Sequence, residues 1–158
     1  MPFFSYPVSF HVKTIIGACL VTALLVPVCI RLAHVFGVLD KPDKRKIHAH
    51  PIPLLGGLAI YFGFLGGLLS HLAELQEFLP LLLAGTIILI VGLIDDVRKL
   101  SARFRLVCQV LCALIIITAG EKISILPPNP VFDSIQIVVT VIWMVGVTNA
   151  YNYLDGMD

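Results

Sequence analysis

Residues 78–94 read FLPLLLAGTIILIVGLI, and the adjacent pair Asp95 and Asp96 follows directly. This run contains no charged residue, and it is long enough to cross a bilayer as a helix, which takes about 17 to 25 mostly apolar residues. An aspartate costs about 2.5 to 3.5 kcal/mol at the bilayer centre, so acidic residues at or near a membrane usually have a function. The stretch predicts a membrane helix that ends in two acidic groups.

The rest of the chain has the same apolar character. The 158 residues are 58% hydrophobic and 13% charged, whereas an average soluble domain has about 25% charged residues. A soluble chain of this length could not bury so much apolar surface in one core. Five runs approach the length of a membrane span: residues 14–36, 52–70, 78–94, 106–120 and 134–149. We predict an all-α, polytopic membrane helical bundle of about five transmembrane helices, forming one integral membrane domain over residues 1–158.

The basic residues indicate the orientation of these helices. Nine of the eleven Lys and Arg residues fall on one side of the predicted topology: Arg31, Lys41, Lys44, Arg45, Lys46, Arg98, Lys99, Arg103 and Arg105. Lys13 and Lys122 fall on the other side. The positive-inside rule then places the N-terminus outside, and it places the segments after the first, third and fifth runs in the cytoplasm. A purely structural membrane protein has no need for three polar segments on one face.

The first of these segments combines cations, histidines and prolines. Residues 39–57 read LDKPDKRKIHAHPIPLLGG, with Lys46 and His48 near the centre. Such cations suit a phosphate-bearing ligand, and the paired glycines allow a backbone to approach a partner closely. A topology signal that touches lipid headgroups explains the same charges. Charge alone leaves both interpretations open.

The second segment contains Asp95 and Asp96. Two carboxylates about 4 Å apart repel by roughly 4 kcal/mol at an effective dielectric of 20. A divalent cation, a shared proton, or the neighbouring Arg98 and Lys99 would relieve this repulsion. Mg²⁺ is a natural solution, because it binds one or two carboxylates together with phosphate oxygens. An exposed helix terminus without a ligand is the simpler alternative.

The third segment, residues 149–158, reads NAYNYLDGMD. If it is helical, the spacing of three places Asn149, Asn152, Asp155 and Asp158 on one polar face. Amides and carboxylates together can bind a hydrated metal ion and a ribose or sugar. We therefore predict a ligand-binding face here.

Small residues predict close helix contacts. Gly63 and Gly67, with Gly66 beside them, form a small-xxx-small pair, and Gly85 and Gly92 could serve the same purpose in the third run. The four cysteines are Cys19, Cys29, Cys108 and Cys112, all within apolar runs. We expect them to act as small hydrophobic residues rather than as disulfides or metal ligands.

Together, the three polar segments resemble the polyprenyl-phosphate N-acetylhexosamine-1-phosphate transferases, glycosyltransferase family 4. Residues 45–57 resemble the RKxHxxPxPxxGG segment of that family. Residues 92–96 resemble its GxxDD element, residues 100–106 its LSARxKL stretch, and residues 149–158 its NAxNxxDGxDGL motif. The resemblance runs from about residue 39 onward. Family members have more membrane helices, so the chain is expected to be an N-terminal portion, truncated at its C-terminus.

Two positions bear on the branch within this family. Lys99 stands where many members have an acidic residue, and the phospho-muramoyl-pentapeptide transferase branch often has a lysine there. Arg105 replaces the usual lysine, which preserves the charge but alters its geometry. The longer match of residues 45–57 favours the undecaprenyl-phosphate N-acetylglucosamine-1-phosphate branch, and the muramoyl branch stays an alternative.

The resemblance implies an enzyme, a phosphotransferase. It would move a sugar 1-phosphate, N-acetylglucosamine 1-phosphate in this branch, from a UDP-sugar to a polyprenyl phosphate and release UMP. This is the first membrane step of cell-envelope polysaccharide synthesis, including cell wall and lipopolysaccharide polymers. The implied location is the bacterial inner membrane, multi-pass, with a cytoplasmic active face. The implied partners are polyprenyl phosphate, a UDP-sugar and the membrane, with a homodimer as a further possibility. The implied cofactor is Mg²⁺, with Mn²⁺ as an alternative.

The resemblance also implies roles for individual residues. Asp95 and Asp96 would be catalytic, holding the metal, positioning the carrier phosphate or acting as a base. The implied substrate-binding residues are Lys46, His48, Arg105, Asn149, Asn152 and Asp155. The implied metal ligands are Asp95, Asp96 and Asp155.

Two other interpretations and one exclusion complete the sequence analysis. A catalytically inactive membrane fragment is one alternative. An ion or proton transporter with Asp95 and Asp96 as a relay is another, but a relay needs polar groups along several helices, and the predicted helix centres are nearly free of ionisable residues. Nucleic-acid binding has no support, because the basic residues are matched by acidic ones and lie at membrane edges.

Overall fold

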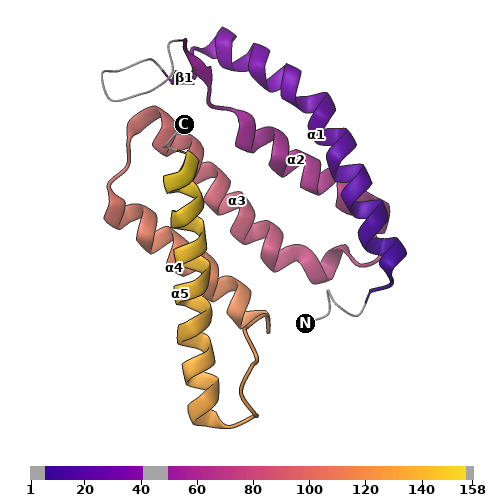
Figure 1. Ribbon diagram of the computed structural model, residues 1–158, viewed down its shortest axis with the longest axis vertical. Coiled ribbons are helices and arrows are strands. Elements are labelled where there is room, and N and C mark those ends of the chain that lie inside the picture. The colour runs from indigo at the N-terminus through magenta and orange to yellow at the C-terminus, as the bar shows by residue number, and fades with distance from the viewer. Residues whose placement is uncertain (1–5, 41–49, 156–158) are drawn as a thin grey trace. The chain divides into compact units, whose positions relative to one another are not determined.

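The computed structural model describes residues 6–40 and 50–155, and within them the chain forms five α-helices, one short 3₁₀ helix and two strands (Figure 1). The α-helices are α1 (Val8–Phe36), α2 (Gly56–Leu68), α3 (Leu75–Arg98), α4 (Ala102–Thr118) and α5 (Pro130–Asp155). The 3₁₀ helix is η2 (Leu69–His71), and the strands are β1 (Leu39–Asp40) and β2 (Ile52–Pro53). The predicted all-α class is confirmed.

The elements form two compact units. The first contains α1, both strands, α2, η2 and the two ends of α3. The second contains the middle of α3 (residues 80–91), α4 and α5. Helix α3 therefore contributes to both units.

Three of the described helices are long and apolar enough to cross a membrane. They are α1, α3 and, over Pro130–Leu154, α5, with mean hydropathies of 2.4, 2.4 and 1.8. At most 17% of the residues in their most apolar windows are buried inside the chain, so their apolar surface needs a non-aqueous surrounding. The chain is a multi-pass membrane protein.

The other two helices are short for a membrane span: α2 is shorter than the run at residues 52–70 that predicted it, and α4 is slightly longer than the run at residues 106–120. Helix α2 has 13 residues and α4 has 17, which at about 1.5 Å per residue gives lengths below the roughly 30 Å hydrocarbon thickness. The run at residues 52–70 loses its beginning to strand β2 and its end to η2. Prolines explain the late start, since the segment before α2 contains Pro51 and Pro53, which disfavour a helix.

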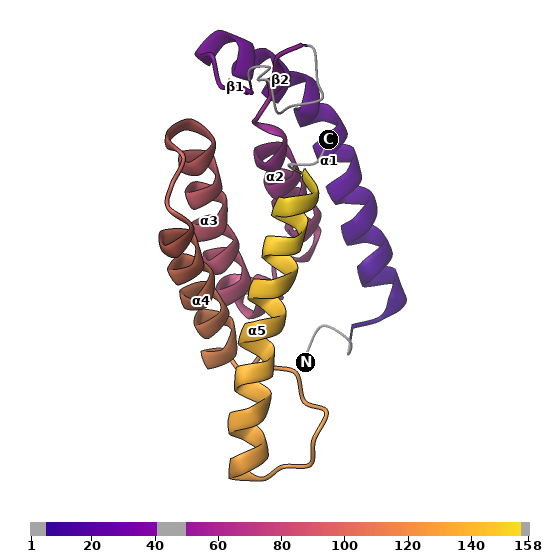
Figure 2. The same cartoon turned by 60° about the vertical axis from the view of Figure 1, so that its left-hand side comes forward.

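Helices α1 and α2 lie side by side and run antiparallel in both views (Figures 1 and 2). A Cβ atom at Gly67 would lie 2.5 Å from the carbonyl oxygen of Thr14, and one at Gly63 would overlap the hydroxyl of Thr22. The predicted close contact at these glycines is confirmed. For Gly92 the prediction finds no support in the described part of the chain, where a Cβ would meet nothing within 4 Å.

A short ribbon of two strands follows α1. Gly37 ends the helix in the left-handed region, at φ 69°, and its N–H bonds to the carbonyl of Ala33. Strand β1 then pairs antiparallel with β2 through Leu39 opposite Pro53 and Asp40 opposite Ile52. The sequence did not predict these strands. Their pairing connects the parts of the chain that come before and after residues 41–49.

An aromatic cluster joins the beginning of α1 to η2 and the beginning of α3. The ring centroid of Phe10 lies 4.3 Å from that of Tyr6, 3.8 Å from His71 and 6.2 Å from Phe78. The Tyr6 hydroxyl donates a hydrogen bond to Glu77 Oε2 at 2.5 Å. This bond, with some desolvation and the negative charge of Glu77, raises the pKa of Tyr6 to about 12.

Candidate functional site

The two adjacent aspartates lie in the last turn of α3, as predicted. Asp95 is half-buried and Asp96 is exposed. The helix ends because Lys99 adopts a left-handed conformation, with φ 49°, and donates its N–H to the Asp95 carbonyl at 2.8 Å. Lysine rarely adopts this conformation, which costs about 1 kcal/mol. The carboxylates are therefore held on a defined helix end.

Negative charge is concentrated at this helix end. The C-terminus of a helix carries a partial negative charge, so acidic side chains there are unfavourable. Asp95 and Asp96 add two like charges to it, while Arg98 is the basic residue of the last turn. Departures from local rules of this kind are expected at functional sites. A cation bound to the pair would relieve both repulsions.

Asp95 and Asp96 are ligands of the type that Mg²⁺ takes. Among residues 6–40 and 50–155, no three His, Cys, Asp or Glu side chains gather as a metal site. Mg²⁺ keeps several waters and commonly takes one or two carboxylates plus substrate phosphates. Asp95 and Asp96 could supply those carboxylates.

The start of α4 fixes the position of Arg105. Ser101 caps the helix, since its Oγ accepts a hydrogen bond from the backbone N–H of Phe104 at 3.3 Å. Serine at this position satisfies a helix N–H that otherwise has no partner within the helix. Arg105 lies in the first turn of α4 and is half-buried.

The third predicted segment is helical as far as Asp155. Asn149 and Asn152, three residues apart in α5, are neighbours on one helix face. Asn149 and Asn152 are exposed. Asp158 lies outside the described residues.

Gln109 of α4 contacts this face, although the sequence analysis did not identify it. Its Nε2 donates to Asn149 Oδ1 at 3.3 Å, and Asn149 Nδ2 donates back to Gln109 Oε1 at 2.7 Å. Asn149 Nδ2 also donates to the carbonyl of Val145 at 2.8 Å. A signal was present, because a glutamine inside an apolar membrane run usually has a partner or a function.

The other predicted site residues fall into two groups. Lys46 and His48 lie outside the described residues. Asp95 and Asp96 belong to the first compact unit, and Asp155 belongs to the second. A metal site formed by these three aspartates therefore stays a prediction.

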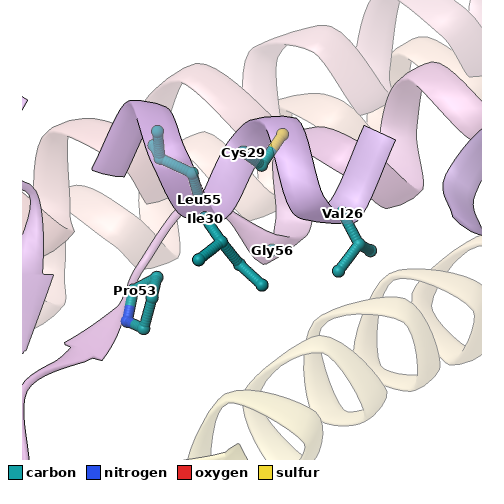
Figure 3. A pocket seen from close by; sticks show the side chains of 6 residues that line it. All are labelled: Val26, Cys29, Ile30, Pro53, Leu55 and Gly56. Carbon is teal, nitrogen blue, oxygen red and sulfur yellow. The ribbon is translucent and has the colours of Figure 1, made fainter. Parts of the chain in front are cut away.

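A cavity in the first compact unit has a mainly apolar lining (Figure 3). Its volume is about 210 Å³, and it is lined by Val26, Cys29, Ile30, Pro53, Leu55 and Gly56. It lies between α1 and the segment that leads into α2. This lining suits a hydrocarbon group better than a charged one.

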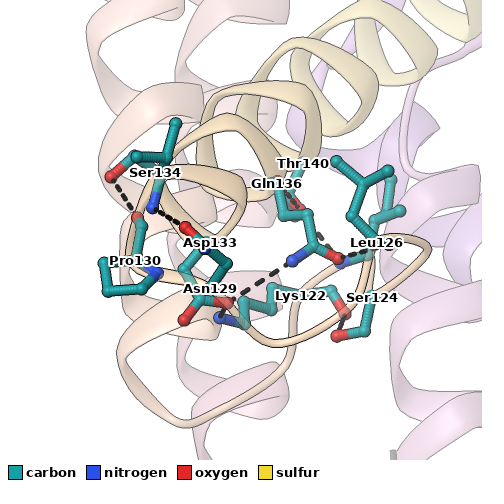
Figure 4. A network of polar contacts seen from close by, with 11 residues as sticks. Lys122, Ser124, Leu126, Asn129, Pro130, Asp133, Ser134, Gln136 and Thr140 are labelled. Carbon is teal, nitrogen blue, oxygen red and sulfur yellow. Dashed lines mark hydrogen bonds and ion pairs between the residues drawn. The ribbon is translucent and has the colours of Figure 1, made fainter.

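A polar network ties the segment before α5 to the first turns of that helix (Figure 4). Lys122 Nζ pairs with Asp133 Oδ1 at 2.8 Å. Gln136 and Thr140, each 4% exposed, accept hydrogen bonds from backbone N–H groups of the segment.

A family comparison covers the second half of the chain, including Asp95, Asp96 and the polar face of α5. The family model described as glycosyl transferase family 4 matches residues 78–158. The chain belongs to glycosyl transferase family 4. Membership of this family agrees with the resemblance found in the sequence.

Several curated proteins are similar to this family 4 chain. The probable undecaprenyl-phosphate N-acetylglucosaminyl 1-phosphate transferase of Bacillus subtilis (strain 168) is 31% identical over 153 residues, covering 93% of this chain and 43% of the relative. The undecaprenyl-phosphate alpha-N-acetylglucosaminyl 1-phosphate transferase of Thermotoga maritima is 35% identical over 123 residues, covering 76% and 37%. The decaprenyl-phosphate N-acetylglucosaminephosphotransferase of Mycolicibacterium smegmatis is 32% identical over 143 residues, covering 80% and 35%. The chain spans less than half the length of these relatives. No solved structure matches it.

Proposed function

We propose that the full-length protein containing this chain transfers N-acetylglucosamine 1-phosphate from UDP-N-acetylglucosamine to a polyprenyl phosphate and releases UMP. The observation that carries the proposal is the pair Asp95 and Asp96 at the C-terminal end of an apolar membrane helix, within the part that matches the family. The proposed substrates are taken from the names of the relatives, which mention undecaprenyl or decaprenyl phosphate and N-acetylglucosamine.

The depth of the aspartate pair favours a lipid-linked phosphate as substrate. A polyprenyl phosphate keeps its chain in the hydrocarbon and its phosphate at the interface, because an ionised phosphate is costly to desolvate. The end of a membrane-spanning helix reaches the same depth. A water-soluble UDP-sugar and a membrane-bound acceptor can therefore meet at this helix end.

The proposed reaction exchanges one diphosphate linkage for another. An oxygen of the polyprenyl phosphate attacks the sugar-linked phosphorus, and a new P–O bond forms. The bridging P–O bond to the uridine-linked phosphate breaks, and its electron pair leaves with UMP. Because the bonds broken and formed are alike, the equilibrium constant of the transfer is close to one. Positioning and charge neutralisation supply most of the catalysis.

In this proposal Asp95 and Asp96 hold Mg²⁺, with Mn²⁺ as an alternative, or position the carrier phosphate. The bound ion would neutralise the charge of the diphosphate. Arg105, fixed by the capped start of α4, would bind phosphate together with two residues outside the described part: Lys46 and His48. The polar face of α5 would bind the nucleotide sugar through Asn149, Asn152 and Asp155.

The proposed orientation follows from the distribution of basic residues. Nine of the eleven Lys and Arg residues fall on the side that the positive-inside rule assigns to the cytoplasm. We place the protein in the bacterial inner membrane with its N-terminus outside and its active face cytoplasmic, in the synthesis of cell wall polymers or lipopolysaccharide.

The experiment is transfer of label to undecaprenyl phosphate in membranes that contain the full-length protein. Two labelled donors are compared, UDP-N-acetylglucosamine and UDP-N-acetylmuramoyl-pentapeptide. The second donor is included because Lys99 resembles the muramoyl branch. Labelled lipid from the first donor alone supports the proposal, and labelled lipid from the second donor alone replaces it with the muramoyl function.

A further inference from the structure

The contact between Gln109 and Asn149 joins polar side chains of two helices that are otherwise rich in apolar residues. Gln109 is half-buried and Asn149 is exposed. The two amides bond reciprocally, at 3.3 Å and 2.7 Å. Exposure leaves Asn149 accessible to a ligand, while Gln109 supports it.

The hydrogen bonds of Asn149 use both of its donors. An asparagine amide has two N–H groups and a carbonyl oxygen with two lone pairs. One N–H goes to Gln109 Oε1 and the other to the carbonyl of Val145, at 2.8 Å. Oδ1 accepts one bond from Gln109 Nε2. What Asn149 can still offer is therefore the second lone pair of Oδ1.

The orientation of this amide is fixed by its neighbours. The Val145 carbonyl can only accept, so it requires Nδ2 on its side. Gln109 then presents Oε1 to the remaining N–H and its own N–H to Oδ1. Turning the Asn149 amide over would place its oxygen against two other oxygens and leave polar groups unsatisfied, which is costly in apolar surroundings.

We propose that Gln109 is a positioning residue that makes Asn149 a hydrogen-bond acceptor for the nucleotide sugar. This inference rests on the proposed function, since it concerns the ligand of the same site. The ligand group that meets Asn149 Oδ1 is a donor, a hydroxyl or an N–H. An ionised phosphate oxygen is excluded, because it can only accept. In UDP-N-acetylglucosamine the donors are the sugar and ribose hydroxyls, the acetamido N–H and the uracil N–H.

The test begins with Gln109→Met in the full-length protein. Methionine has a similar length but cannot bond to the Asn149 amide. The KM for UDP-N-acetylglucosamine is expected to rise about tenfold, the effect of one lost hydrogen bond, with kcat within about threefold of wild type. Gln76→Met, at an exposed position in the first turn of α3, is the matched control and should leave KM unchanged. A KM within twofold of wild type in Gln109→Met overturns the inference.

A second variant separates positioning from simple helix pairing. The exchange Gln109→Asn with Asn149→Gln keeps one amide on each helix and the same total side-chain length, so the pair can form again at a shifted position. We expect the exchange to restore the Tm of the purified protein while KM stays raised. Recovery of both KM and Tm would mean that the pair only holds α4 and α5 together, and it would overturn the inference.

Binding measurements keep this inference distinguishable from the proposed function. The affinities of UMP and UDP-N-acetylglucosamine are measured by calorimetry, which needs no turnover. Weaker binding of both ligands by Gln109→Met assigns the donor to the nucleoside, and weaker binding of the UDP-sugar alone assigns it to the sugar. A wild type that binds the UDP-sugar without transferring label would defeat the proposed function, and the binding comparison would still decide the role of Gln109. A wild type that binds neither ligand overturns both.

Discussion

Gly63 of α2 and Thr22 of α1 meet with no room for a side chain between them. A Cβ atom at Gly63 would overlap the Thr22 hydroxyl, and it would also lie 2.9 Å from the carbonyl oxygen of Ala18. A backbone oxygen cannot rotate away as a side chain can. The first compact unit therefore depends on glycine at this position.

Gly63→Ala is expected to destabilise the protein by about 1 to 3 kcal/mol, the usual cost of forcing an extra carbon into a packed contact. The thermal unfolding midpoint of the purified protein measures this. Gly92→Ala is the control, since a Cβ there meets nothing within 4 Å, and removing a helical glycine stabilises by about 0.5 to 1 kcal/mol. Equal midpoints for the two variants would show that α1 and α2 do not pack as described.

The hydrogen bond from Tyr6 to Glu77 predicts a pH dependence. The folded pKa of Tyr6, about 12, lies above the usual value near 10, so folding favours the neutral phenol. The stabilisation is present below pH 10 and is lost as the pH rises through 12. The difference in Tm between wild type and Tyr6→Phe should therefore be constant from neutral pH to about pH 9 and shrink above pH 10. Tyr153→Phe, at an exposed position of α5, is the control. A difference in Tm between wild type and Tyr6→Phe that grows above pH 10 would contradict the raised pKa of Tyr6.

The buried hydroxyl of Thr140 accepts a hydrogen bond from the N–H of Ile123 at 3.0 Å. Thr140→Val keeps the shape of the side chain and leaves that N–H without its acceptor, at an expected cost of about 1 to 3 kcal/mol. Proteolysis of residues 121–129 should become faster. Thr118→Val, at the exposed end of α4, tests the same chemical change outside the network. Cleavage rates that are equal in the two variants would mean that the network does not hold this segment.

Asp96→Asn should abolish transfer of label, because it halves the carboxylate charge of the pair while keeping the side-chain size. Asp133→Asn, which disrupts an ion pair of the second compact unit, should retain more than half of the wild-type turnover. Turnover above a tenth of wild type in Asp96→Asn would remove that residue from the catalytic role.

The long helices of the fold could be predicted from the sequence, because each is a continuous apolar run. Residues 78–94 lie within α3, and residues 134–149 lie within α5. Pro51 and Pro53 could indicate the late start of α2, but strand β2 and its pairing with β1 could not be predicted. Asp40 pairs with Ile52 across residues 41–49. Such a pairing between separate stretches of the chain is not visible in the local sequence.

The candidate site was predicted only in part, for the same reason. Asp95 and Asp96 could be found because the apolar run stops at them. The helical spacing of Asn149, Asn152 and Asp155 could also be read from the sequence. Gln109 could not be assigned a partner, because Asn149 is 40 residues away and the contact depends on how α4 packs against α5.

The central claim is tested most directly by transfer of label from UDP-N-acetylglucosamine to undecaprenyl phosphate with and without Mg²⁺. Membranes containing the full-length protein, the Asp95→Asn variant or the Asp96→Asn variant are compared at equal expression. We predict labelled lipid from the wild type only when Mg²⁺ is present, a loss of more than tenfold in both variants, and release of UMP equal to the label transferred. Undiminished transfer after complete removal of divalent cations, or by the variants, would contradict a metal-dependent site at the end of α3.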